Sequence, residues 1–109
     1  MKTIVIITVS LFAASAMSVR AADAKANWDN NCVQCHGKNG AADTKMGKTL
    51  NAKDFTDSKV QAAFTDAKAA QSIKEGVKEN GKTTMKAFGG KLSDDEVKAL
   101  VAYVRTLKK

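Results

Sequence analysis

The sequence predicts an all-α fold of three to five short helices. Proline is absent from the 109 residues, and runs of β-branched residues are rare beyond residue 21. Alanine, lysine, glutamate and leucine, which favour helices, recur there at helical spacing. The length allows one small domain, which buries only about 60% of its unfolded surface. We therefore expect the helices to need the support of a covalently held group.

Residues 1–21 are predicted to be a signal peptide. Lys2 supplies a positive start, residues 4–17 are apolar, and residues 19–21 offer a small-residue cleavage site. An uncleaved anchor is the alternative, although this stretch is shorter than the about 20 residues that cross a bilayer. Cleavage would place one domain, residues 22–109, in the periplasm without a membrane-spanning segment. It would also lower the formal charge by two, from +7 to +5.

Residues 23–32 are predicted to form the first helix, and Cys32-Val-Gln-Cys35-His36 follows at its end. The cysteines are three positions apart, so both thiols lie on one turn of helix. Each thiol can attach to a haem vinyl group, and the adjacent imidazole can reach the iron. The run therefore predicts one covalently attached haem c, held by Cys32, Cys35 and His36.

Zinc binding, a redox pair and a plain disulfide are the other roles open to these cysteines. A structural zinc site usually needs four Cys or His ligands, and the chain has two cysteines and one histidine. A thioredoxin-like pair expects a βαβ neighbourhood, which the flanking residues do not suggest. Haem attachment is favoured, and an exported location agrees with it because c-type haem is attached outside the cytoplasm.

The middle of the chain is less regular. Residues 37–54 contain three glycines and are predicted to form an irregular loop. A short helix is expected from Asp57 or Ser58 to Phe64, and another from Asp66 to about residue 78, where Asn80-Gly81 ends it.

The last helix has the clearest pattern. Ser93 is a predicted N-cap, and Glu96, three positions on, completes a capping box. An apolar stripe at helical spacing follows: Val97, Leu100, Val101, Val104 and Leu107.

A second axial ligand is needed if His36 binds iron. His36 is the only histidine, so ligation by two histidines of one chain is excluded. Met46, Met85, a lysine amine or a water-filled position remain. Met46 lies only ten residues beyond His36, whereas Met85 lies 49 residues beyond it, in the predicted loop 81–90. Chain geometry favours Met85 for the opposite side of the haem.

The chain resembles the class I monohaem cytochromes c of the small soluble bacterial type. The resemblance rests on residues 32–37, on residues 100–107 of the last helix, and on residues 85–90, where the family often has Met-Pro-Ala-Phe-Gly. It implies a cytochrome c fold over residues 22–109, with Met85 as the second axial ligand.

The same resemblance has consequences for packing. It implies that the first and last helices cross, with Trp28 near Tyr103 and the small residue Ala24 at the crossing. The family commonly has a proline whose carbonyl accepts the imidazole N–H, and Gly47 stands in its place. Lys86 replaces the proline after Met85. The Gly47 carbonyl can still accept this bond, and both loops are expected to be less stiff than in the family.

With both axial positions filled, the chemistry expected is the transfer of single electrons between redox partners, not catalysis. A haem enzyme or a ligand-sensing module would instead need a labile sixth position. We expect a monomer that binds no nucleic acid. Six lysines come from loops predicted to border the haem and could steer it to acidic docking patches: Lys38, Lys45, Lys48, Lys82, Lys86 and Lys91.

Overall fold

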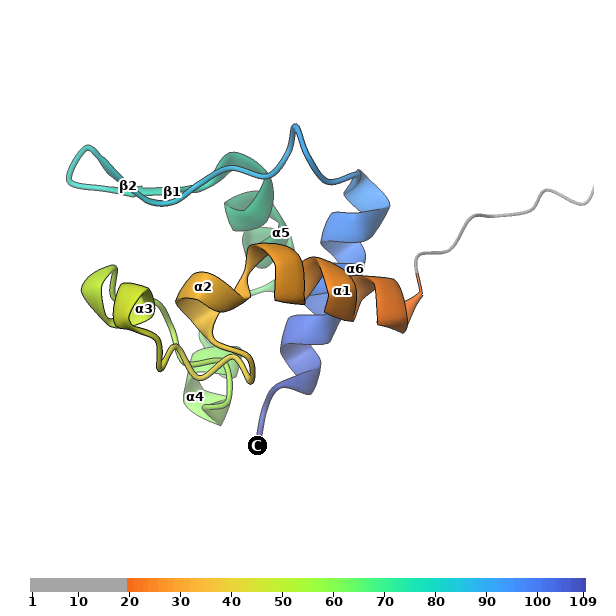
Figure 1. Cartoon of the computed structure of the whole chain (residues 1–109), viewed down its shortest axis with the longest axis horizontal. Coiled ribbons are helices and arrows are strands. Elements are labelled where there is room, and N and C mark those ends of the chain that lie inside the picture. The colour runs from red at the N-terminus through yellow and green to blue at the C-terminus, as the bar shows by residue number, and fades with distance from the viewer. Residues whose placement is uncertain (1–19) are drawn as a thin grey trace, which may run out of the picture.

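The computed structural model describes residues 20–109, which form six helices and one hairpin (Figure 1). The predicted signal peptide, apart from Arg20 and Ala21, lies outside the described residues. Within residues 20–109, no helix is both long and apolar enough to cross a membrane. The elements are α1 Ala21–Asn31, α2 Val33–His36, α3 Lys45–Thr49, α4 Ser58–Ala62, α5 Asp66–Glu75, β1 Val77–Glu79, β2 Lys82–Met85 and α6 Asp94–Thr106.

The crossing of α1 and α6 is the centre of the fold. In Figure 1, α1 (orange) passes across α6 (blue), and the two helices pack directly on each other. Trp28 and Ala24 of α1 are each 2% exposed, and the Trp28 ring lies 5.5 Å from the ring of Tyr103 on α6. The predicted crossing and the predicted Trp28–Tyr103 contact are both confirmed.

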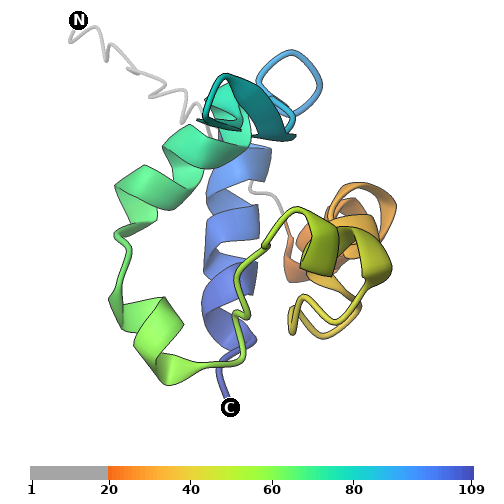
Figure 2. The same cartoon turned by 90° about the vertical axis from the view of Figure 1, so that its left-hand side faces the viewer.

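Helix α6 begins where the capping box predicted. The Ser93 hydroxyl accepts the Glu96 N–H at 3.1 Å, and the Glu96 carboxylate accepts the Ser93 N–H at 3.1 Å. The apolar stripe faces the core: Val97, Leu100, Val101 and Val104 are buried, and Leu107 packs against the core as the C-cap residue. In Figure 2, α6 stands between α4 and α5 on one side and α1 to α3 on the other.

The boundaries of the middle helices differ from prediction. Helix α4 begins after Asp57 as expected but ends at Ala62. Helix α5 ends at Glu75, because Gly76 adopts a positive φ of 77° that leaves the helical conformation. Asn80-Gly81 was expected to end this helix. It instead forms the turn of the antiparallel β1–β2 hairpin, with positive φ at both residues, as a two-residue hairpin turn requires.

The segment 37–54 is not irregular throughout. It contains α3, whose N-cap Thr44 accepts the Gly47 N–H through its hydroxyl at 2.9 Å. Helix α3 packs on α2. The fold is therefore all-α with one small added hairpin. Helix α3 and the hairpin, which the sequence did not predict, both lie next to predicted site residues.

Candidate functional site

Cys32, Cys35 and His36 are presented by a single turn of backbone. The Cys32 N–H ends α1 by donating to the Trp28 carbonyl at 2.9 Å, and the Cys32 carbonyl then accepts the His36 N–H at 2.9 Å. Gly37 has a φ of 80° and ends α2 directly after His36. Both cysteines are half-buried free thiols. The chain thus carries two thiols and one imidazole on one turn of backbone.

Burial shifts the pKa values of Cys32 and His36. It raises the pKa of the Cys32 thiol to about 11, with a further contribution from the charge of Cys35. It lowers the pKa of His36 below its ordinary value. A redox-active thiol needs a lowered pKa, so Cys32 has the opposite of that property. His36 is held in the neutral form that binds metals. Within residues 20–109, no three or more His, Cys, Asp or Glu side chains are grouped to hold a metal ion among themselves.

The His36 ring lies among aromatic side chains. It stacks on Phe55, with ring centroids 4.9 Å apart and planes 25° apart, and its centroid is 5.8 Å from that of Trp28. His36 Nδ1 is buried and has no hydrogen-bond partner within residues 20–109. The Gly47 carbonyl, expected to accept the His36 N–H, instead accepts the Ala52 N–H at 2.8 Å. The bond from His36 is not formed in this structure, although a carbonyl that accepts one hydrogen bond keeps a second lone pair.

Gly47 has a different role, which is close approach to the motif. A Cβ built on Gly47 would run into the Cys35 carbonyl oxygen. Thr44 joins the same backbone segments, because its hydroxyl donates to the Cys35 carbonyl at 2.9 Å and accepts the Gly47 N–H at 2.9 Å. A proline at position 47 would lose that N–H and add ring atoms where even one carbon does not fit. The departure from the family pattern at this position therefore has a steric reason.

The two candidate methionines lie in different environments. Met85 ends β2, is half-buried, and packs against the apolar cluster that contains Trp28 and Phe88; Cys32 packs against the same cluster. Met46 lies on α3 and is 41% exposed. Of the two thioethers, that of Met85 therefore shares an apolar environment with the cysteine motif.

Hydrogen bonds hold the Met85 segment without the family proline. Met85 pairs with Val77 in the hairpin. Three residues on, the Phe88 N–H donates to the Ile73 carbonyl at 2.8 Å, and the Gly89 N–H donates to the Lys74 carbonyl at 3.1 Å. These two carbonyls belong to the last turn of α5, where they have no partners inside the helix. Both ends of the segment are thus fixed, although Lys86 replaces proline.

Sequence reasoning missed three residues at this site. Thr44 belongs to a residue type preferred at N-caps, so its position before α3 could have been found. Phe55 and Gln61 had no such signal, because their roles depend on contacts with residues distant in the sequence.

A family model described as "Cytochrome C oxidase, cbb3-type, subunit III" matches residues 19–104. The chain belongs to the cytochrome c family. The cytochrome is 32% identical over 105 residues to cytochrome c6 of a Picosynechococcus species, an alignment that covers 92% of this chain and 84% of that relative.

Solved structures agree with this assignment. A c-type cytochrome named KustC0563 is similar at a TM-score of 0.71 with 37% identity, over 79% of this chain and 98% of that one. A tyrosine-to-phenylalanine mutant of the same protein gives a TM-score of 0.69 with 37% identity, over 79% of this chain and 99% of the mutant. The cytochrome is therefore a small class I monohaem cytochrome c with covalently attached haem c. It is an electron carrier that exchanges electrons with redox partners, not an enzyme.

Proposed function

We propose that this cytochrome carries single electrons between periplasmic redox proteins, with its haem held by Cys32, Cys35, His36 and Met85. Haem c supplies a one-electron iron couple. The observation that carries the assignment is that Cys32 and Met85, from opposite halves of the chain, pack against one apolar cluster, and that the His36 ring lies beside Trp28 of that cluster.

Each residue has a distinct task in this proposal. The two cysteines would hold the haem through thioether bonds, and His36 would give the iron a nitrogen lone pair. The soft Met85 sulfur favours ferrous iron and raises the reduction potential. Phe88, which is 5% exposed, and the α6 stripe keep water away from this region and act in the same direction.

The ligand assignment is tested with a matched pair of variants, Met85→Ala and Met46→Ala. We expect Met85→Ala to lose the sulfur-to-iron charge-transfer band of the ferric spectrum, to lower the potential and to bind cyanide rapidly. Met46→Ala should keep the wild-type spectrum. The reverse result would make Met46 the ligand. Rapid cyanide binding by the wild-type protein would instead indicate a labile sixth position.

Export and cleavage rest on the pattern of residues 1–21. Intact-mass measurement on protein released from the periplasm tests both features at once. We expect one haem added to a polypeptide that begins at residue 22. A colourless product with the mass of the bare polypeptide would overturn the haem assignment, and a full-length membrane-bound product would indicate an anchor.

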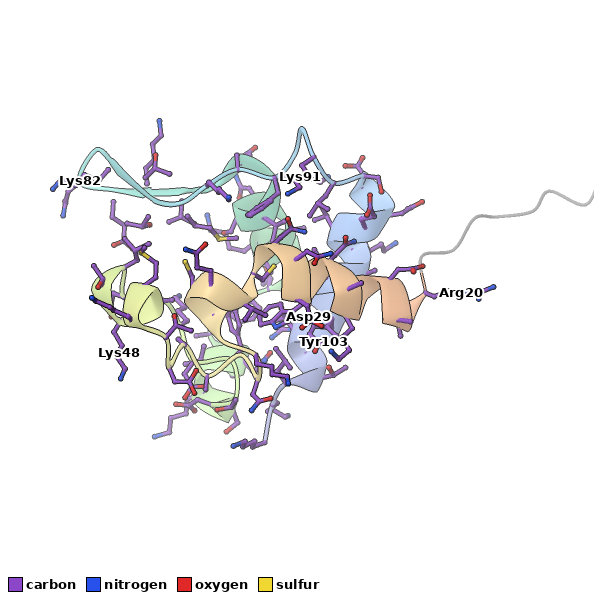
Figure 3. The ribbon with its side chains drawn as sticks, in the orientation of Figure 1. Arg20, Asp29, Lys48, Lys82, Lys91 and Tyr103 are labelled. Carbon is purple, nitrogen blue, oxygen red and sulfur yellow. The ribbon has the colours of Figure 1, made fainter. Side chains whose placement is uncertain are left out.

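A basic docking surface is supported for part of the predicted lysine ring. Lys48 on α3 and Lys82 on the hairpin lie at the same end of the molecule, whereas Lys91 lies away from them, towards α6 (Figure 3). All six lysines of the predicted ring are exposed. We propose that the end carrying Lys48 and Lys82 meets an acidic patch of the partner.

The docking surface can be probed with ferrocyanide, a small anionic electron donor. We expect the double variant Lys48→Glu/Lys82→Glu to be reduced more slowly at low salt, with the difference shrinking as salt rises. Lys98→Glu/Lys108→Glu changes the net charge equally at α6 and its C-terminal end and serves as the control. Equal slowing by both pairs would mean that net charge, not this surface, governs the encounter.

A further inference from the structure

Gln61 is the one polar side chain buried among the described residues 20–109, at 6% exposure. Its Nε2 donates to the Phe55 carbonyl and to the Val104 carbonyl, both at 2.8 Å. Its Oε1 accepts a hydrogen bond from Arg105 Nη1 at 3.0 Å. Both amide N–H groups are therefore used, and the amide joins α4 to α6 and to the segment before α4.

Arg105 prevents the Gln61 amide from turning. Its Nη2 donates to the Phe64 carbonyl at 2.8 Å, its Nε donates to Asp66 at 2.8 Å, and its guanidinium lies 4.2 Å from the centre of the Phe64 ring. A planar guanidinium with this many partners has little rotational freedom. The orientation of the Gln61 amide is therefore set by α6.

Phe55 is held through its backbone on both sides. Its N–H donates to the Gly40 carbonyl at 2.8 Å, and its carbonyl accepts from Gln61. Its ring stacks on His36 and meets the Phe64 ring edge-on, with ring centroids 5.9 Å apart. Gln61 thus fixes the backbone from which the stacked ring projects.

Of the two aromatic rings beside the His36 imidazole, that of Phe55 is the nearer, at 4.9 Å, and that of Trp28 lies at 5.8 Å. A ligating imidazole is usually oriented by a hydrogen bond from its second ring nitrogen. Here Nδ1 is buried without an acceptor within residues 20–109, and the Gly47 carbonyl is bonded to Ala52. The Phe55 ring is also the more nearly parallel to the imidazole of the two, at 25° against 35° for Trp28.

We propose that Gln61 is a positioning residue for the His36 imidazole and acts through Phe55. The inference rests on the proposed function, since it takes His36 as the iron ligand. Loss of the Gln61 amide frees the Phe55 carbonyl, the Phe55 ring shifts, and the plane of the imidazole rotates with it. The predicted consequence is spectroscopic, because hyperfine-shifted haem methyl resonances of the ferric protein depend on the plane of the axial histidine.

The experiment compares Gln61→Met, Phe55→Leu and the double variant as holoproteins. We expect each single variant to change the spread of the ferric haem methyl shifts and to move the reduction potential. The double variant should resemble Phe55→Leu alone, because Gln61 then has no ring left to position. Ser93→Ala, which removes the cap at the other end of α6, is the control and should leave the methyl shifts unchanged.

Several results would overturn the inference. Wild-type methyl shifts in Gln61→Met would do so, and so would independent, additive shifts in the double variant. If Gln61→Met does not accumulate, Gln61→Glu serves instead. Its carboxylate keeps the contact with Arg105 but donates to neither carbonyl, so it should give the same shifts. A wild-type protein without an iron-bound His36 would refute the proposed function itself, whereas a normal wild-type spectrum with unresponsive variants refutes only the role of Gln61.

Discussion

The ring of Trp28 on α1 lies 5.5 Å from the ring of Tyr103 on α6, and the two planes are inclined by 49°. Trp28 is 2% exposed at the point where the two helices cross. Because α1 leads directly into Cys32, this contact also fixes where the cysteine motif begins. The packing of α1 on α6 therefore also determines where the site lies.

Trp28→Ala should be among the most destabilising substitutions in the protein. Loss of a fully buried indole costs about 3–5 kcal/mol in the free energy of unfolding. Denaturant unfolding of the oxidised holoprotein measures it. Tyr103→Phe removes only a hydroxyl and is the control, expected within about 0.5 kcal/mol of wild type. A loss below about 1 kcal/mol for Trp28→Ala would show that the crossing is not the main support of the fold.

Ser93→Ala should lower the free energy of unfolding by about 1 kcal/mol, because the Glu96 N–H at the start of α6 then loses its acceptor. Ser58→Ala is a matched control, since Ser58 is the first residue of α4 and Asp57 is the cap there. Thermal or denaturant unfolding of both variants provides the comparison. Equal effects at the two serines would contradict a specific capping role.

The stability of the protein should depend on pH through Glu96. Hydrogen bonds from the Ser93 backbone and from Asn27 lower the pKa of Glu96 below its ordinary value of 4.5. A carboxyl whose pKa is lower in the folded state binds fewer protons folded than unfolded. Its stabilising contribution is therefore fully present above pH 4.5 and is lost as the pH falls through the folded pKa.

The test measures the free energy of unfolding of the wild type and of Glu96→Gln from pH 7 to below pH 4.5. We expect the variant to be less stable at pH 7 and the difference to shrink below pH 4.5. Asp95→Asn serves as a control on the same helical turn, because no side-chain hydrogen bond of Asp95 is present within residues 20–109. A wild-type advantage that grew on acidification would show that the sign is wrong.

Gly47→Ala should disturb both stability and haem content. The added Cβ would meet the Cys35 carbonyl oxygen, and relief of such overpacking costs about 1–3 kcal/mol. We expect a lower yield of haem-bearing protein, measured as haem absorbance per polypeptide, and a lower unfolding midpoint. Gly90→Ala is the control, because nothing lies within 4 Å of a Cβ at that position. Equal behaviour of the two variants would rule out the close approach.

Prediction of the fold succeeded where the signal was local. The capping box at Ser93 and the apolar stripe from Val97 onward lie within a few residues of each other, and α6 formed as expected. The hairpin was missed because its strands contain only three and four residues, too few to show an alternating pattern. Asn80-Gly81 is also ambiguous on sequence grounds, since the same pair can end a helix or turn a hairpin.

The features of the site likewise fall into those that the sequence predicted and those that only the folded structure revealed. Cys32, Cys35 and His36 are neighbours in the chain, so their spacing was enough to predict the motif before any packing was known. The family resemblance also needed residues 85–90 and 100–107. The environment of Met85, the engagement of the Gly47 carbonyl by Ala52 and the path from Gln61 through Phe55 to His36 required the folded arrangement. Those contacts join residues from separate elements. A hydrogen bond or a stacked ring between distant segments produces no periodic pattern in the amino-acid sequence, so the sequence alone does not predict it.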